Sequence, residues 1–156
     1  MMIETSWGPL EVDEGQIYHF PKGIPGFEEE KRFALISNQD EPFQYLQSLQ
    51  ETYLSFLIAD PFLFYPDYEF ELPDPDSKEL KIEDEMLIRC MITLKDPVET
   101  STMNLLAPLV LNPKLQLGKQ IVLHASAYST KQKLWDPSGN TKGEEKEDAG
   151  TFTQKG

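Results

Sequence analysis

The chain has a single cysteine, Cys90, among its 156 residues. A lone thiol excludes an internal disulfide and is typical of a reducing compartment, so we expect a cytoplasmic protein. Histidine is nearly as scarce, since His19 and His124 are its two positions. Zinc sites need several Cys and His ligands at close spacing. Because these three residues stand far apart in the sequence, we expect no metal site and no cofactor.

Long apolar runs are also missing. No stretch approaches the ~18 consecutive apolar residues of a membrane-spanning helix, and residues 1–5 lack the basic and then apolar order of a signal peptide. The sequence contains no P-loop, no GxGxxG and no nucleophile elbow. We therefore expect no membrane association and no enzyme of the classes that these motifs serve.

Positive charge is the third scarcity. Lys and Arg number 14 against 27 Asp and Glu, which gives a net charge of −13. The excess is concentrated early, because residues 1–85 hold 20 acids and 5 bases, and residues 67–85 alone hold 9 acids and 2 bases. Lys and Arg contacts to phosphate dominate nucleic-acid affinity, so direct nucleic-acid binding is disfavoured. A basic protein partner fits this charge; the alternative is that the acids only form solvated faces.

Short apolar segments punctuated by Gly and Pro are what the sequence does contain. The longest alternation places five residues on one face of residues 86–94: Met86, Ile88, Cys90, Ile92 and Leu94. Similar segments lie at residues 3–7, 10–12, 17–20, 33–36, 43–45, 53–58, 105–111 and 121–128, and the acids after residue 67 alternate with apolar residues as on a strand. This spacing predicts a mainly β, single-domain, antiparallel β-barrel-like fold with at most one or two short helices.

One helix and one tail complete the expected organisation. Asp76 and Glu79 have capping-box spacing, which predicts a helix over residues 76–82. From Asp136 onward the chain is almost entirely polar, and such a segment cannot bury enough apolar surface to become ordered. We therefore expect a β domain over residues 1–131 and a disordered polar tail over residues 132–156.

Residues 60–68 place aromatic side chains between prolines, immediately before the acidic segment. They either seal the core or expose an aromatic anchor beside the acids, as interfaces often do. Under the second interpretation the candidate partner-binding residues are Phe62, Phe64, Tyr65, Asp67, Glu69, Glu71, Asp74, Asp76 and Glu79. Catalysis by these acids is disfavoured, because general acid–base catalysis needs a carboxyl with a raised pKa in a cleft.

A Gly/Pro loop at residues 20–28 is the most distinctive motif, and we expect Phe20 and Phe27 to anchor its two ends in the core. Together with residues 43–49, 55–61, 104–112 and 118–123, in this order, the loop resembles the FliW family of bacterial flagellar assembly factors over about residues 2–128. The motif positions with an expected structural role are Gly23, Pro25, Gly26, Phe27, Asp60, Pro61, Asn104, Pro108 and Asn112. Pro108 has no N–H, so we expect it at a strand edge or a bulge.

The resemblance implies a small, mostly β cytoplasmic protein without enzymatic activity. Members of the family bind flagellin in the cytoplasm and, when flagellin is exported, bind and antagonise CsrA, a basic RNA-binding translational repressor. A monomer is expected. Two alternatives stay open from the residues themselves: a barrel that binds a small molecule, and an acidic hydrolase.

Overall fold

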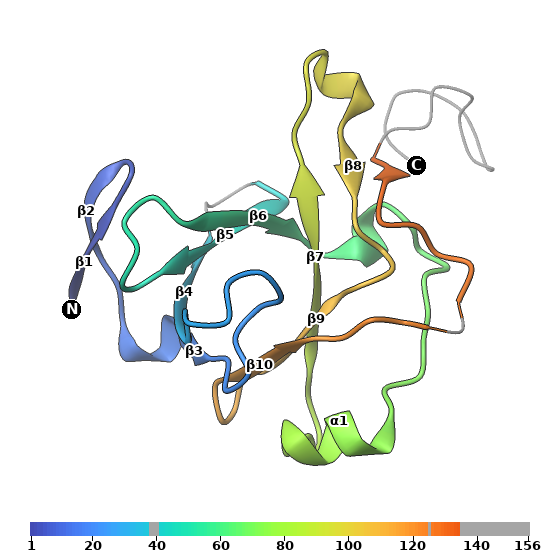
Figure 1. The fold of residues 1–156 in the computed structure, drawn as a ribbon, viewed down its shortest axis with the longest axis horizontal. Helices are drawn as coiled ribbons and strands as arrows, with labels where there is room; N and C mark the ends of the chain where they lie inside the picture. Colours follow the sequence, from blue (N-terminus) through green and yellow to red (C-terminus); the bar gives the residue numbers. More distant parts are fainter. Residues whose placement is uncertain (38–40, 125, 135–156) are drawn as a thin grey trace.

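Seven strands close into a barrel in the computed structural model, which describes residues 1–37, 41–124 and 126–134 (Figure 1). These described residues form eleven strands in all: β1 (Met2–Thr5), β2 (Gly8–Glu11), β3 (Ile17–His19), β4 (Arg32–Ser37), β5 (Phe43–Ser48), β6 (Ser55–Ala59), β7 (Leu87–Thr93), β8 (Thr102–Met103), β9 (Leu109–Asn112), β10 (Leu117–Gln120) and β11 (Gln132–Lys133). The ring runs β7-β6-β5-β4-β3-β10-β9, and β9 pairs with β7 to close it. The predicted mainly β, barrel-like fold is confirmed. One ring pairing, β3 with β10, is parallel.

The barrel interior is filled by large side chains. Phe20, Phe33, Leu46, Ile58 and Leu109 belong to one core cluster, and all are fully buried. A barrel that binds a small molecule keeps open volume where these side chains lie. The packing therefore argues against the ligand-binding alternative.

A second core lies outside the barrel. Ile88, Cys90 and Ile92 share one face of β7, as their alternation predicts, and all three are buried in this outer core. The prediction was wrong for Met86 and Leu94, which lie just outside β7 and are exposed. The segment between β6 and β7 covers the outer core together with side chains of residues 121–124 and 126–134. On another side, the β1–β2 hairpin packs on β4 through a small third cluster.

Two predicted strands are wrong. Residues 67–73 form no strand, although exposed and buried side chains do alternate there. The described residues 121–124 and 126–128 form none either. The N–H groups of Ile121 and Leu123 donate to carbonyl oxygens of residues 108 and 106, which continues the path of β10 irregularly. The strand predicted at 105–111 begins only at Leu109, so Pro108 lies just outside it.

The predicted helix is present but displaced, and its capping prediction is wrong. Helix α1 spans Asp74–Glu79, Pro73 occupies its N-cap position, and no side chain caps it. Three short 3-10 turns accompany it: η1 (Glu14–Gln16), η2 (Pro61–Leu63) and η3 (Val98–Thr100). At the other end of the chain, β11 pairs with β8 beyond the boundary predicted at residue 131. Residues 135–156, most of the predicted tail, lie outside the described residues.

The Gly/Pro loop is anchored at one end only. Phe20 is fully buried, as expected, but Phe27 is 42% exposed. Its ring instead rests against Phe56, with centroids 5.2 Å apart. The expectation that both phenylalanines enter the core was therefore wrong for Phe27.

Candidate protein-binding surface

The connector, residues 60–73, links β6 to α1 and carries the predicted aromatic residues. Asp60 begins η2, because its carboxylate accepts a hydrogen bond from the N–H of Phe62 at 2.9 Å and Pro61 follows it. Such a cap fixes where the turn begins. The turn leaves Phe62 40% exposed and Leu63 61% exposed.

The other predicted aromatic residues are only partly exposed. Phe64 stacks on Phe43 of β5 with ring centroids 6.1 Å apart. The hydroxyl of Tyr65 donates to the carbonyl oxygen of Lys133. Among the three predicted aromatics, Phe62 is thus the exposed one, and sequence reasoning missed Leu63 because a leucine among aromatics gives no separate signal.

Tyr68 holds the connector against the outer core. Its side chain is 4% exposed, and its hydroxyl donates to the carbonyl oxygen of Leu105 at 2.7 Å. Burial raises the pKa of this hydroxyl far above its ordinary value. Burial also raises the pKa of the Cys90 thiol to about 12, so this cysteine stays protonated and unreactive.

The predicted acids divide into two groups. The exposed group, called the acidic edge below, consists of Asp67, Glu69, Glu71 and Asp74. Asp67 and Glu69 flank Tyr68, whose ring lies 5.7 Å from that of exposed Phe62. The hydroxyl of Tyr128 accepts a hydrogen bond from the N–H of Glu69 at 3.0 Å, which fixes the backbone of this edge.

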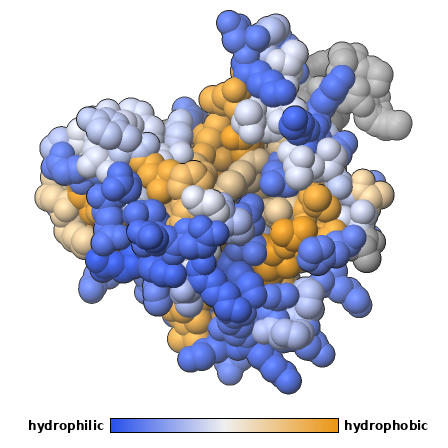
Figure 2. Space-filling view, viewed as in Figure 1, coloured by the Kyte–Doolittle hydropathy of each residue, from blue (hydrophilic) through white to orange (hydrophobic). Residues whose placement is uncertain are grey.

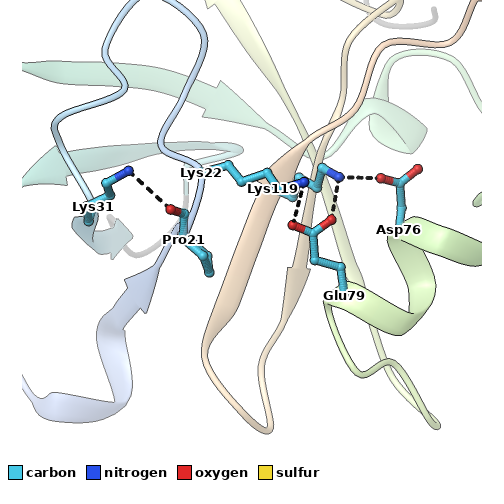
Figure 3. Close-up of polar contacts among 6 residues, drawn as sticks. All are labelled: Pro21, Lys22, Lys31, Asp76, Glu79 and Lys119. Atoms are coloured by element: carbon cyan, nitrogen blue, oxygen red, sulfur yellow. Dashed lines mark hydrogen bonds and ion pairs between the residues drawn. The ribbon is translucent and has the colours of Figure 1, made fainter.

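Asp76 and Glu79 are instead partly buried and are bound by lysines from other elements (Figure 3). Lys119 of β10 lies 2.5 Å from Asp76 and 2.7 Å from Glu79, and Lys22 of the Gly/Pro loop lies 3.2 Å from Glu79. The Lys119 hydrogen bond lowers the pKa of Glu79. Partial burial disfavours the charged Lys119, but its two carboxylate partners outweigh this and raise its pKa. These two acids therefore join elements and are poor candidates for partner contact.

The Gly/Pro loop needs its glycines for different reasons. Gly23 has a φ of +67°, and a Cβ there would lie 2.5 Å from the backbone of Glu28. Gly26 has a φ of +92°, in the region that side chains disfavour, and its N–H donates to the Glu28 carboxylate. That hydrogen bond lowers the pKa of Glu28. Pro25, between the two glycines, is exposed.

Two asparagines organise backbone around β9. Asn104 accepts hydrogen bonds from the N–H groups of residues 106 and 107, which shapes the turn before Pro108. Asn112 is 3% exposed; its amide donates to the carbonyl oxygens of Leu80 and Lys81, and its oxygen accepts from residues 114 and 115. These contacts agree with a structural role for both residues.

The described residues offer little for the hydrolase alternative. The acids brought together by α1 include Glu79, whose pKa is lowered, whereas a general acid needs a raised one. Within residues 1–37, 41–124 and 126–134, no three Cys, His, Asp or Glu side chains come together as a metal site would require. No helix in that part of the chain has the length and apolar character to cross a membrane. Apolar areas do reach the surface between hydrophilic ones (Figure 2).

Comparisons with known proteins agree on one family. The family model described as FliW protein matches residues 2–134. The flagellar assembly factor FliW of Bacillus subtilis (strain 168) is 40% identical over 138 residues, which cover 86% of this chain and 96% of the relative. The Desulfitobacterium hafniense (strain Y51) protein of the same name is 44% identical over 139 residues, with 86% and 91% covered. A crystal structure of the flagellar assembly factor FliW superposes with a TM-score of 0.81 at 37% identity, covering 87% of this chain and 98% of that one.

Proposed function

Since this chain belongs to the FliW family of flagellar assembly factors, we propose that it binds flagellin in the cytoplasm and, once flagellin is exported, binds and antagonises the repressor CsrA. The protein acts by binding its partners and catalyses no reaction. When flagellin accumulates, it occupies the binding surface of this protein, and CsrA remains free to repress translation. Export of flagellin leaves the binding surface of this protein free, and the protein then binds CsrA.

The observation that carries this proposal beyond the family is the pairing of apolar and acidic groups on the connector. Phe62 and Leu63 supply exposed apolar surface, and the acidic edge begins four residues after Leu63. Apolar anchors provide most of the binding energy in interfaces, whereas rim charges mainly set association rate and partner choice. A basic repressor fits the edge, and an apolar flagellin segment fits the anchor.

Charge reversal tests this proposal. The triple variant Asp67→Lys, Glu69→Lys and Glu71→Lys should slow association with CsrA about tenfold at low salt, because steering by opposite charge is lost. The matched control reverses Glu83, Asp84 and Glu85, which are also exposed and give the same net charge. Association rates measured by stopped flow, at low and moderate salt, compare the two variants. Equal rates for both triples would show that the acidic edge has no special part.

A further inference from the structure

Four aromatic side chains, called the aromatic row below, follow one another along the outer face of β5. Trp7, in the turn between β1 and β2, contacts Tyr45 with ring centroids 4.8 Å apart. Phe43 contacts Phe64 of the connector at 6.1 Å. Tyr45 and Phe43 are two residues apart in β5, so they project from the same face about 7 Å from each other. The row thus joins the N-terminal hairpin to the connector.

The aromatic row is accessible over its whole length. Trp7 is 60% exposed, and the other three side chains are half-buried. Ile36 and Leu57 pair with Tyr45 from the two neighbouring strands, so they lie on the same face, and both are half-buried as well. Exposed apolar strips of this kind often mark interaction sites.

Anchoring of the hairpin does not account for Trp7. Ile3 and Val12, at 5% and 1% exposure, already pack the hairpin against Ala34 of β4. Trp7 adds a contact with one ring and leaves most of its own side chain in water. Exposed tryptophans are enriched among the residues that dominate binding energy in interfaces.

The surroundings of the aromatic row carry negative charge. Arg32, at the start of β4, is exposed, but residues 1–21 and 33–77 contain no Lys or Arg. Exposed acids lie on the hairpin, at Glu4 and at Glu11, which pairs with the N-terminal ammonium group of Met1, and on the acidic edge at the other end. Arg89 of β7 donates to Gln44, whose side chain alternates to the opposite face of β5. The charge therefore selects a cationic partner.

We propose that the aromatic row is the docking site of a basic partner that inserts an apolar side chain against Trp7. The occupant is CsrA, because a basic protein complements a face with exposed acids at both ends and, in the strands β4, β5 and β6, Arg32 as its one cationic side chain. This inference rests on the proposed function and adds a contact surface that reaches from the connector to the N-terminal hairpin.

Substitution of Trp7 tests the row directly. Trp7→Ala should weaken CsrA binding at least about tenfold in calorimetric titration, as expected for an interface anchor. Tyr53→Ala is the matched control, because Tyr53 is an aromatic residue in the β5–β6 turn, 85% exposed and outside the row. The control should bind within about twofold of the unchanged protein, which marks a surface change without consequence. Thermal unfolding of both variants verifies that they fold.

Hydroxyl-radical footprinting of the unchanged protein keeps the test independent of folding. Bound CsrA should protect Trp7 and Tyr45 from oxidation and leave Tyr53 as reactive as before. Unchanged CsrA affinity in Trp7→Ala together with unprotected Trp7 would overturn the row as the docking site while the proposed function stands. A loss confined to flagellin binding would also overturn it, because the occupant would then be the wrong one. Failure of the unchanged protein to bind either partner would overturn the proposed function itself.

Discussion

At position 118, the absence of a single methyl group sets how closely β10 approaches the barrel core. A Cβ on Gly118 would lie 2.5 Å from the ring of Phe20 and 2.9 Å from the side chain of Leu111. Phe20 is fully buried among other large side chains, so its ring has no free space to enter. The glycine is therefore required by packing.

Gly118→Ala should lower the free energy of unfolding by about 1–3 kcal/mol, the usual cost of overpacking a core. Gly15→Ala is the matched control, because a Cβ there meets nothing within 4 Å. We expect the control to change stability by less than about 0.5 kcal/mol. Urea denaturation of both variants measures the difference, and equal stabilities would contradict the packing described around Phe20.

Residue-level prediction succeeded where the residue type alone decides the environment. Buried Cys90 and the backbone roles of Gly23 and Asn112 follow from small size, conformational freedom and hydrogen-bonding groups. It failed for Phe27, because an apolar side chain can be satisfied by one neighbouring ring at the surface. It also could not separate Phe62 from Phe64, since the partner ring, Phe43, lies about 20 residues away in the sequence.

In helix α1, the three-residue spacing of Asp76 and Glu79 serves an interaction with another strand and not a helix cap. Asp76 and Glu79 suggested a cap because they are three residues apart, but the same spacing places both on one helix face. There they bind Lys119 of β10, and Lys22 joins them from the Gly/Pro loop (Figure 3). The sequence could not place Lys119 opposite the helix, since that contact spans 43 residues.

The charges that hold α1 predict a pH dependence. Glu79 has a lowered pKa in the folded protein, so the unfolded chain binds its proton more readily. Its stabilising effect is therefore present above the ordinary glutamate pKa of 4.5 and is lost as the pH falls through the lowered folded value. Glu79→Gln should cost about 0.5–1 kcal/mol at neutral pH, as partly exposed ion pairs do.

Thermal denaturation across a pH series measures this effect. The stability difference between the unchanged protein and Glu79→Gln should shrink steadily as the solution is acidified below pH 4.5. Glu29→Gln, at an exposed glutamate just after the Gly/Pro loop, serves as the control for the removal of one negative charge. A Glu79→Gln difference that stays constant down to strongly acidic pH would mean that the ion pairs do not hold α1.

The sequence predicts most of the fold of the whole molecule, but it does not predict how the strands pair to close the barrel. Alternation and Gly/Pro punctuation predict many short strands around a core, and the barrel confirms this. Closure depends on pairing of β7 with β9 and of β3 with β10, the second joining residues about 100 positions apart. Nothing local in the sequence specifies such long-range pairings, so the order of strands needed the structure.

The central claim about the whole molecule is that two partners bind to one small acidic surface. The connector lies at one end of the aromatic row, because Phe64 belongs to both. Partners that each use the connector must therefore compete. The account predicts that the protein holds flagellin or CsrA, with only the CsrA complex strongly weakened by salt, because added salt screens exposed charges beyond ~10 Å.

Size-exclusion chromatography with light scattering, on the protein mixed with flagellin and CsrA at matched concentrations, tests this claim most directly. The account predicts two complexes, each containing the protein and one partner, and conversion of the CsrA complex into the flagellin complex as flagellin is added. A single species whose mass contains the protein, flagellin and CsrA together would contradict it.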